Sequence, residues 1–201
     1  MPLAAATVFI VDDDAEVRRA VSLLIRSVGL ADHSYASAQE FLKNYDATAP
    51  GCLVLDIRMP GMSGLELQKG SSVARGLPPI IFLTGHGEIS TAIQAIRAGA
   101  IDFLQKPFSP QVLLERIREA IELDLENRRK CVLADELQER VIRLTERERE
   151  IMQYLAQGIS TKRIAGSLAI SPKTVDNHRE SILEKMNVDN TTQLAHLIAI
   201  Q

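Results

Sequence analysis

A short apolar run, Thr7–Val11, stops abruptly at three consecutive aspartates, Asp12, Asp13 and Asp14. A brief β-branched and aromatic run bounded by polar residues is typical of a strand buried in a parallel sheet. Open α/β sheets bind ligands at the carboxyl ends of their strands, where these carboxylates would lie. Because clustered carboxylates repel one another, they need a cation, a proton or a nearby lysine. The run therefore predicts an α/β fold with an acidic site at one edge of its sheet.

Four further runs predict strands along the first half of the chain. They are Ala31–Tyr35, Cys52–Asp56, Ile80–Leu83 and Asp102–Gln105. Between them, apolar residues recur at helical spacing and are closed by glycine or polar residues. A (βα) order repeated five times predicts a doubly wound five-stranded parallel sheet with helices on both faces.

The later strands end on residues suited to phosphoryl chemistry. Asp56 and Thr84 close two of them, and Lys106 follows the last. Each residue alone is more often a turn, strand or solvated residue, but their conjunction at successive strand ends is rare by chance. Mg²⁺ prefers hard oxygen ligands and keeps several waters. A carboxylate beside Mg²⁺ and a lysine can act as the nucleophile of phosphoryl transfer.

Composition places few other limits on function. The chain has 201 residues, of which 46% are hydrophobic and 24% charged, which is ordinary for a globular protein. It has no stretch of roughly 20 apolar residues and no basic leader. Cys52 and Cys131 lie far apart and the four histidines are scattered, so we expect no disulfide framework. We therefore expect a cytoplasmic protein that does not bind membranes.

The middle of the chain predicts a helical linker. Two apolar stripes, 114–125 and 133–144, flank the polar segment Glu126–Lys130. The segment is either a solvated linker or part of a long helix that pairs two chains. We expect three parts: an α/β domain over residues 1–123, a linker over 124–139 and a small all-α domain over 140–201.

The last part predicts a helix-turn-helix. Thr145 and Glu148 have the spacing of a capping box, and the three-residue turn Ala169–Ser171 separates two short helices. Residues 140–201 hold 9 basic and 7 acidic residues. A net charge this small requires that any DNA-binding surface be a local patch, doubled by dimerisation.

A helical wheel of the second of these helices separates two faces. Val175, Ile182 and Met186 share the core side, and Arg179 and His178 border it in packing roles. Polar residues lie opposite, where lysines can contact phosphates and a glutamate can accept from cytosine. With residues of the preceding helix, the candidate DNA contacts are Lys162, Lys173, Thr174, Asn177, Glu180, Ser181 and Lys185.

The strand-end motifs resemble those of response-regulator receiver domains. The matching motifs are Val11–Asp14, Asp56 before Met59-Pro60-Gly61, Thr84-Gly85-His86-Gly87 and Lys106-Pro107. The resemblance implies that Asp56 accepts a phosphoryl group from a phosphohistidine of a sensor histidine kinase, with Lys106 and Thr84 assisting. It further implies that Thr84 and Phe103 form the switch pair and that the Lys106–Pro107 bond is cis. The implied Mg²⁺ ligands are Asp13, Asp56 and the backbone carbonyl of Arg58, with Asp12 helping directly or through water.

The last part resembles the LuxR-type output domain of NarL/FixJ regulators, in the FixJ-like branch. The residues that carry this resemblance include Leu144-Thr145, Arg147-Glu148, Gly158, Ser171–Val175 and Lys185-Met186. The two resemblances together imply a two-component transcription regulator rather than an enzyme. Its expected partners are the kinase, promoter DNA and a second copy of the phosphorylated chain, with RNA polymerase as a further candidate.

Two alternatives differ in class. A haloacid-dehalogenase type of hydrolase also uses an aspartate at a strand end with Mg²⁺, but it needs a second aspartate two residues after the nucleophile. Arg58 occupies that position. An unregulated DNA-binding protein with a vestigial receiver is the other alternative, and the full set of strand-end residues argues against it.

Overall fold

The chain forms two compact units in a computed structural model that describes residues 6–70, 76–85 and 89–199. Unit 1 covers residues 1–128 and unit 2 covers residues 129–201. The long helix α5, Pro110–Ile142, contributes to both units. Within the described ranges, no helix is long and apolar enough to cross a membrane.

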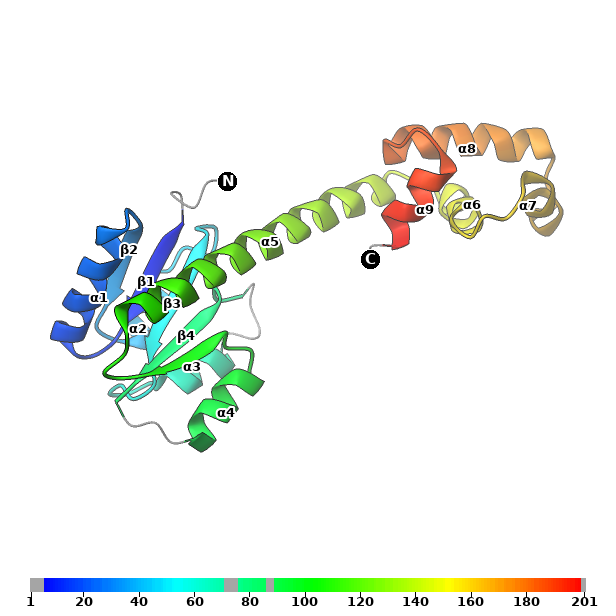
Figure 1. Cartoon of the computed structure of the whole chain (residues 1–201). Helices are drawn as coiled ribbons and strands as arrows, with labels where there is room; N and C mark the ends of the chain where they lie inside the picture. The colour runs from blue at the N-terminus through cyan, green and yellow to red at the C-terminus, as the bar shows by residue number, and fades with distance from the viewer. Residues whose placement is uncertain (1–5, 71–75, 86–88, 200–201) are drawn as a thin grey trace. The chain divides into compact units, whose positions relative to one another are not determined.

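Unit 1 contains the predicted five-stranded parallel sheet, in the order β2-β1-β3-β4-β5 (Figure 1). The strands are β1 Thr7–Val11, β2 Ala31–Tyr35, β3 Gly51–Asp56, β4 Ile80–Thr84 and β5 Asp102–Gln105. The strand order reverses at β1, since β2 lies on one side of it and β3 on the other. This reversal creates a switch point between β1 and β3, where the connections leave toward opposite faces of the sheet.

Helices cover both faces of this sheet. They are α1 Ala15–Ser27, α2 Ala38–Asn44, α3 Gly64–Gly70, α4 Ile89–Arg97 and the first part of α5. One apolar cluster joins the sheet to α1 and α5 through Ile25 and Ile117, and the other joins it to α2 and α3 through Phe41 and Leu67. All four side chains are almost fully buried, and burial of such a side chain stabilises the fold by about 2 kcal/mol. The predicted α/β fold class is confirmed.

Short polar contacts set the helix boundaries. The carboxylate of Asp14 accepts hydrogen bonds from the backbone N–H groups of Glu16 and Val17, so it caps α1. Gly29, at φ +76°, follows the end of that helix as predicted. Ser90 precedes the apolar residues Ile93 and Ile96, which predicts that it caps their helix, but this prediction is wrong because α4 begins at Ile89 and Ser90 lies inside its first turn. Serine occurs in first turns as well as at caps, so its position in the sequence did not fix the boundary.

Unit 2 is entirely helical among its described residues. Its helices are α6 Glu146–Ala156, α7 Thr161–Leu168, α8 Pro172–Met186 and α9 Thr191–Ala199, together with the end of α5. The predicted capping box is present, because Thr145 and Glu148 each bond the other's backbone N–H. One core holds the unit together, and α5 joins it through Leu137. Three residues connect α7 to α8, as a helix-turn-helix requires.

Candidate functional site

Four of the predicted residues meet at the carboxyl edge of the sheet. Asp12 follows β1, Asp56 ends β3, Thr84 ends β4 and Lys106 follows β5. These four strands are consecutive neighbours in the sheet. Asp12, Asp56 and Thr84 are 1%, 6% and 2% exposed. The residues therefore form a buried polar site beside the switch point between β1 and β3, where open α/β sheets bind ligands.

Lys106 joins the two buried carboxylates. Its Nζ lies 2.6 Å from Oδ2 of Asp12 and 2.8 Å from Oδ1 of Asp56. The second oxygen of each carboxylate accepts a backbone hydrogen bond, from Asp14 N at 2.9 Å and from Arg58 N at 2.8 Å respectively. These contacts fix the orientation of both carboxylates, so neither needs to reorganise before it meets a ligand.

The protonation of the site follows from this geometry. Burial raises the pKa of the Asp56 carboxyl above its ordinary value, and the Lys106 ammonium opposes this shift while the charge of Asp12 adds to it. Burial lowers the pKa of Lys106, but its hydrogen bonds to Asp12 and Asp56 outweigh burial and the pKa is raised. Lys106 is therefore held as an ammonium that lies between the two buried carboxylates.

A glycine allows the loop after Asp56 to fold back over the strand end. A Cβ atom on Gly64 would lie 2.3 Å from the carbonyl oxygen of Asp56, which no side chain tolerates. The backbone N–H of Gly64 donates to the Ile57 carbonyl at 3.0 Å. Gly61, in the same loop, has φ +81°, which favours glycine. This segment brings the start of α3 close to the backbone of Asp56.

The donor set fits a hard divalent cation. Two buried carboxylates share Lys106 as a partner, and the exposed Asp13 is adjacent in sequence to Asp12. In the part of the chain that the structure describes, no three His, Cys, Asp or Glu side chains gather as a complete metal cluster. A cation here would therefore complete its shell with waters and a backbone carbonyl, such as that of Arg58, which is how Mg²⁺ binds in proteins.

The structure bears on the other predicted residues of unit 1 to different extents. Phe103 is half-buried and packs against the cluster that lies on α2 and α3. The Lys106–Pro107 bond is cis, as the receiver resemblance implied. His86 and Gly87 of the Thr84–Gly87 motif lie outside the described residues. Arg18, which sequence reasoning missed, donates to the carbonyls of Asp12 and Asp13 at 2.7 and 3.0 Å and braces the acidic loop. The position of Arg18 one turn into α1, soon after the acidic run, could have indicated this contact.

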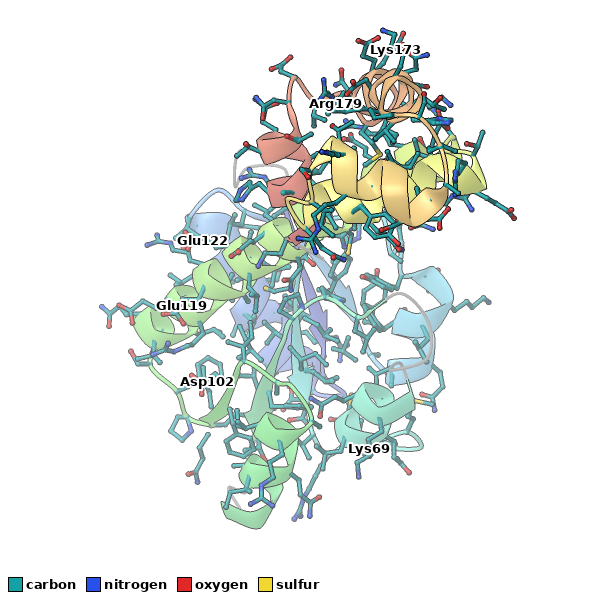
Figure 2. The ribbon with its side chains drawn as sticks, turned by 90° about the vertical axis from the view of Figure 1, so that its right-hand side faces the viewer. Lys69, Asp102, Glu119, Glu122, Lys173 and Arg179 are labelled. Carbon is teal, nitrogen blue, oxygen red and sulfur yellow. The ribbon has the colours of Figure 1, made fainter. Side chains whose placement is uncertain are left out.

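The candidate DNA contacts lie mainly on α8. Lys173, Asn177 and Glu180 are exposed there, and Thr174 is half-buried beside the cap residue Ser171. Lys162 is exposed on α7. Figure 2 shows Lys173 on the outer side of α8.

The core side of α8 matches the wheel. Val175, Ile182 and Met186 are fully buried. Arg179 is half-buried, as predicted, and its Nη1 lies 3.5 Å from Oδ1 of Asp176. Asp176, Glu180 and Glu184 are acidic residues spaced four apart on this helix, and the ion pair partly neutralises Asp176, which reduces the repulsion of phosphates.

Ser181 and Lys185 differ from the other candidates because their side chains bond a residue of another helix, α6. Ser181 Oγ and Lys185 Nζ donate to the buried carboxylate of Glu148 at distances of 2.7 to 2.8 Å. The sequence predicted the capping role of Glu148 but not these bonds. Ser181 and Lys185 lie 33 and 37 positions after Glu148, and such long separations give no sequence pattern from which a contact could be predicted.

Comparison with known proteins identifies the family. Residues 8–118 match the response regulator receiver domain, and residues 143–198 match the luxR family of bacterial regulatory proteins. The chain belongs to the NarL/FixJ family of response regulators. This regulator is similar to the response regulator protein TodT of Pseudomonas putida, with 40% identity over 193 residues that cover 96% of this chain and 85% of TodT.

Two further relatives cover nearly the whole regulator. The transcriptional regulatory protein FixJ of Azorhizobium caulinodans is 37% identical, over 94% of this chain and 90% of FixJ. A solved structure of the response regulator StyR is 41% identical with a TM-score of 0.87, and the match covers 98% of this chain and 100% of that chain. The family confirms that the chain is a transcription regulator and not an enzyme. A receiver domain implies a histidine kinase partner, and a luxR-type domain implies DNA binding.

Proposed function

We propose that Asp56 accepts a phosphoryl group from a phosphohistidine of a sensor kinase and thereby controls DNA binding by α7 and α8. The observation that carries the proposal is the buried Asp12–Lys106–Asp56 arrangement at the switch point of the sheet. A carboxylate oxygen of Asp56 attacks phosphorus, the P–N bond of the phosphohistidine breaks, and the imidazole nitrogen leaves with the electron pair. The product is an acyl phosphate on Asp56.

The other residues at this edge have distinct roles. Lys106, already 2.8 Å from Asp56, pairs with a phosphoryl oxygen. Asp12, Asp13, Asp56 and the carbonyl of Arg58 would hold Mg²⁺, which supplies the positive charge that the phosphoryl oxygens need. The hydroxyl of Thr84 donates to the new group, and Phe103 changes rotamer with it. Phosphorylation adds up to two negative charges at a buried site, so it biases a conformational equilibrium that α4 and β5 transmit.

Labelling with acetyl phosphate and Mg²⁺ tests the phosphoacceptor. The Asp56→Asn variant should lose the label entirely, whereas Asp135→Asn, which changes an exposed aspartate of α5, should keep it. Full labelling of the Asp56→Asn variant would contradict the assignment. Sedimentation with and without beryllofluoride and Mg²⁺ tests the proposal that the phosphorylated form is a homodimer.

DNA binding is proposed through two kinds of contact. Lys162, Lys173 and Thr174 contact phosphates, and Asn177 and Glu180 contact base edges. The Asn177→Ala variant should change sequence preference, while Lys162→Ala should weaken binding to all sequences alike. Equal losses on selected and random duplexes for both variants would refute this division.

A further inference from the structure

The carboxylate of Glu148 is a buried charge that connects two helices of unit 2. Glu148 lies in the first turn of α6 and is 4% exposed. Its Oε2 accepts hydrogen bonds from the backbone N–H and the hydroxyl of Thr145 at 2.8 and 3.0 Å. A buried carboxylate is costly unless each oxygen has donors. The capping box supplies part of this need at one oxygen only.

The remaining donors come from α8. Lys185 Nζ lies 2.8 Å from Oε1 and 2.7 Å from Oε2 of Glu148, and Ser181 Oγ lies 2.7 Å from Oε1. Ser181 and Lys185 are four residues apart, so they share one side of α8. The side chain of Lys185 is 34% exposed. Both polar groups are therefore directed toward α6, beside the buried residues Ile182 and Met186.

Hydrogen bonds at this place are directional, so they favour one rotation of α8 about its axis. Apolar packing of Val175, Ile182 and Met186 holds the helix in the core, but apolar contacts have little directional preference. With a helix radius of about 5 to 6 Å, a rotation of about 20° moves a side-chain position on the opposite face by about 2 Å. That displacement is enough to break a hydrogen bond to a base edge. Asn177 and Glu180 lie on the exposed face that such a rotation would move.

We propose that Glu148 is a positioning residue for DNA recognition, and that Ser181 and Lys185 serve it as anchors of α8 rather than as contacts to DNA. The inference rests on the proposed function of α8 as the helix that enters the groove. It assigns two of the seven candidate DNA residues to a contact within the protein. It also gives the capping box a second purpose, because the same carboxylate begins α6 and orients α8.

The salt dependence of DNA binding tests this assignment. The probe is a duplex that the full wild-type chain, with Mg²⁺ and beryllofluoride, selects from a random-sequence library. The slope of log Kobs against log salt is negative, and loss of one phosphate contact reduces its magnitude by about 0.9. Lys173→Met, the control that removes a proposed phosphate contact, should show that loss. Lys185→Met should weaken binding about tenfold with a slope change below about half of that value.

Conservative variants separate positioning from folding. Glu148→Gln keeps an oxygen for the cap and should weaken binding to the selected duplex more than to random DNA. The double variant Glu148→Gln/Lys185→Met should recover part of the loss, because removing both partners of a buried pair costs less than removing one. Ser181→Ala, which removes one hydroxyl, should reduce affinity a few-fold without changing the slope.

Hydrogen exchange of α8 amides, measured without DNA, gives an independent reading. Exchange over residues 181–186 should increase in Glu148→Gln and in Lys185→Met and recover in the double variant. The inference is overturned if Lys185→Met reduces the magnitude of the slope by about 0.9 while Glu148→Gln binds like the wild type. A wild-type chain that selects no sequence would instead overturn the proposed function, and this inference with it.

Discussion

The side chain of Arg128 closes the amino-terminal edge of the sheet in unit 1, and its removal gives the sharpest test of how that unit is held. Arg128 Nε lies 2.6 Å from Oδ2 of Asp124, one turn earlier in α5. Its two Nη atoms donate to the carbonyl oxygens of residues 47–49 at 2.8 to 3.1 Å. Asp124, which is 7% exposed, also accepts from the backbone N–H of Gly51 at 2.9 Å. One arginine thus ties α5 to the loop that precedes β3.

The Arg128→Ala variant should lose about 3 kcal/mol of the free energy of unfolding of unit 1. Each charge-assisted hydrogen bond contributes about 1.5 to 3 kcal/mol when buried. The arginine side chain is 29% exposed, so water replaces part of this contribution. The larger cost is at Asp124, whose buried charge would keep, among the described residues, the hydrogen bond from the Gly51 N–H. For a unit of this size, about 3 kcal/mol lowers the midpoint of thermal unfolding by about 10 °C.

This change is measured by thermal unfolding in which pulsed hydrogen exchange is the probe, and peptides from β1 and β3 report on unit 1 alone. A probe specific to one unit is needed because a chain of two units does not unfold as one transition. Arg129→Ala is the matched control, since Arg129 is the next residue of the same helix and is exposed. Its midpoint should move by less than about 2 °C. Equal shifts for the two variants would refute the anchoring role of Arg128.

Three other predictions concern single positions. Burial raises the pKa of Glu148, but hydrogen bonds from Lys185, Ser181 and Thr145 together outweigh burial and lower this pKa from 4.5 to about 2. The ionised form therefore adds about 3 kcal/mol of stability above pH 4.5, which is lost as the pH falls through about 2. The stability advantage of the wild type over Glu148→Gln in acid titrations should disappear over that interval, and an unchanged advantage at low pH would contradict the shift. Gly51→Ala should destabilise unit 1 by about 3 kcal/mol in urea unfolding, because the new Cβ would lie 1.9 Å from the Thr7 carbonyl oxygen. Ala169→Gly should raise the stability of unit 2 by about 1 kcal/mol, since residue 169 has φ +51°, and a decrease would show that this backbone is not strained.

The sequence predicted the parts of the fold that depend on local pattern. The buried runs of β1, β3 and β4 became strands within one residue of their expected ends, because burial on both faces requires an uninterrupted apolar segment. The edge strands β2 and β5 also lie at their expected positions, although their side chains are mostly exposed or half-buried. The predicted convergence of Asp12, Asp56 and Lys106 followed from parallel strands sharing one edge. Thr145 and Glu148 were identified as a capping box because both members lie within one turn.

Contacts between distant residues were not predictable in this way. Asp124 bonds Gly51 across 73 positions, and Lys185 bonds Glu148 across 37. The sequence separation in these pairs does not show that Asp124, Glu148 and Lys185 are bonded, because solvated charged residues occur at the same separations. The start of α4 was misplaced for a different reason, since a helix boundary depends on a balance of weak preferences over several residues. The domain boundaries at residues 123 and 139 stay predictions.

The two cysteines of this regulator have opposite environments, and this makes the natural chain suitable for site-specific labelling. Cys52 is fully buried in β3, where burial raises the pKa of its thiol far above the ordinary value, while Cys131 is exposed on α5. Thiol reagents attack the thiolate, so a fluorophore or spin label should attach to Cys131 alone while the protein is folded. A probe placed there, three residues after Arg128, could follow the regulator during phosphorylation without any substitution in its sequence.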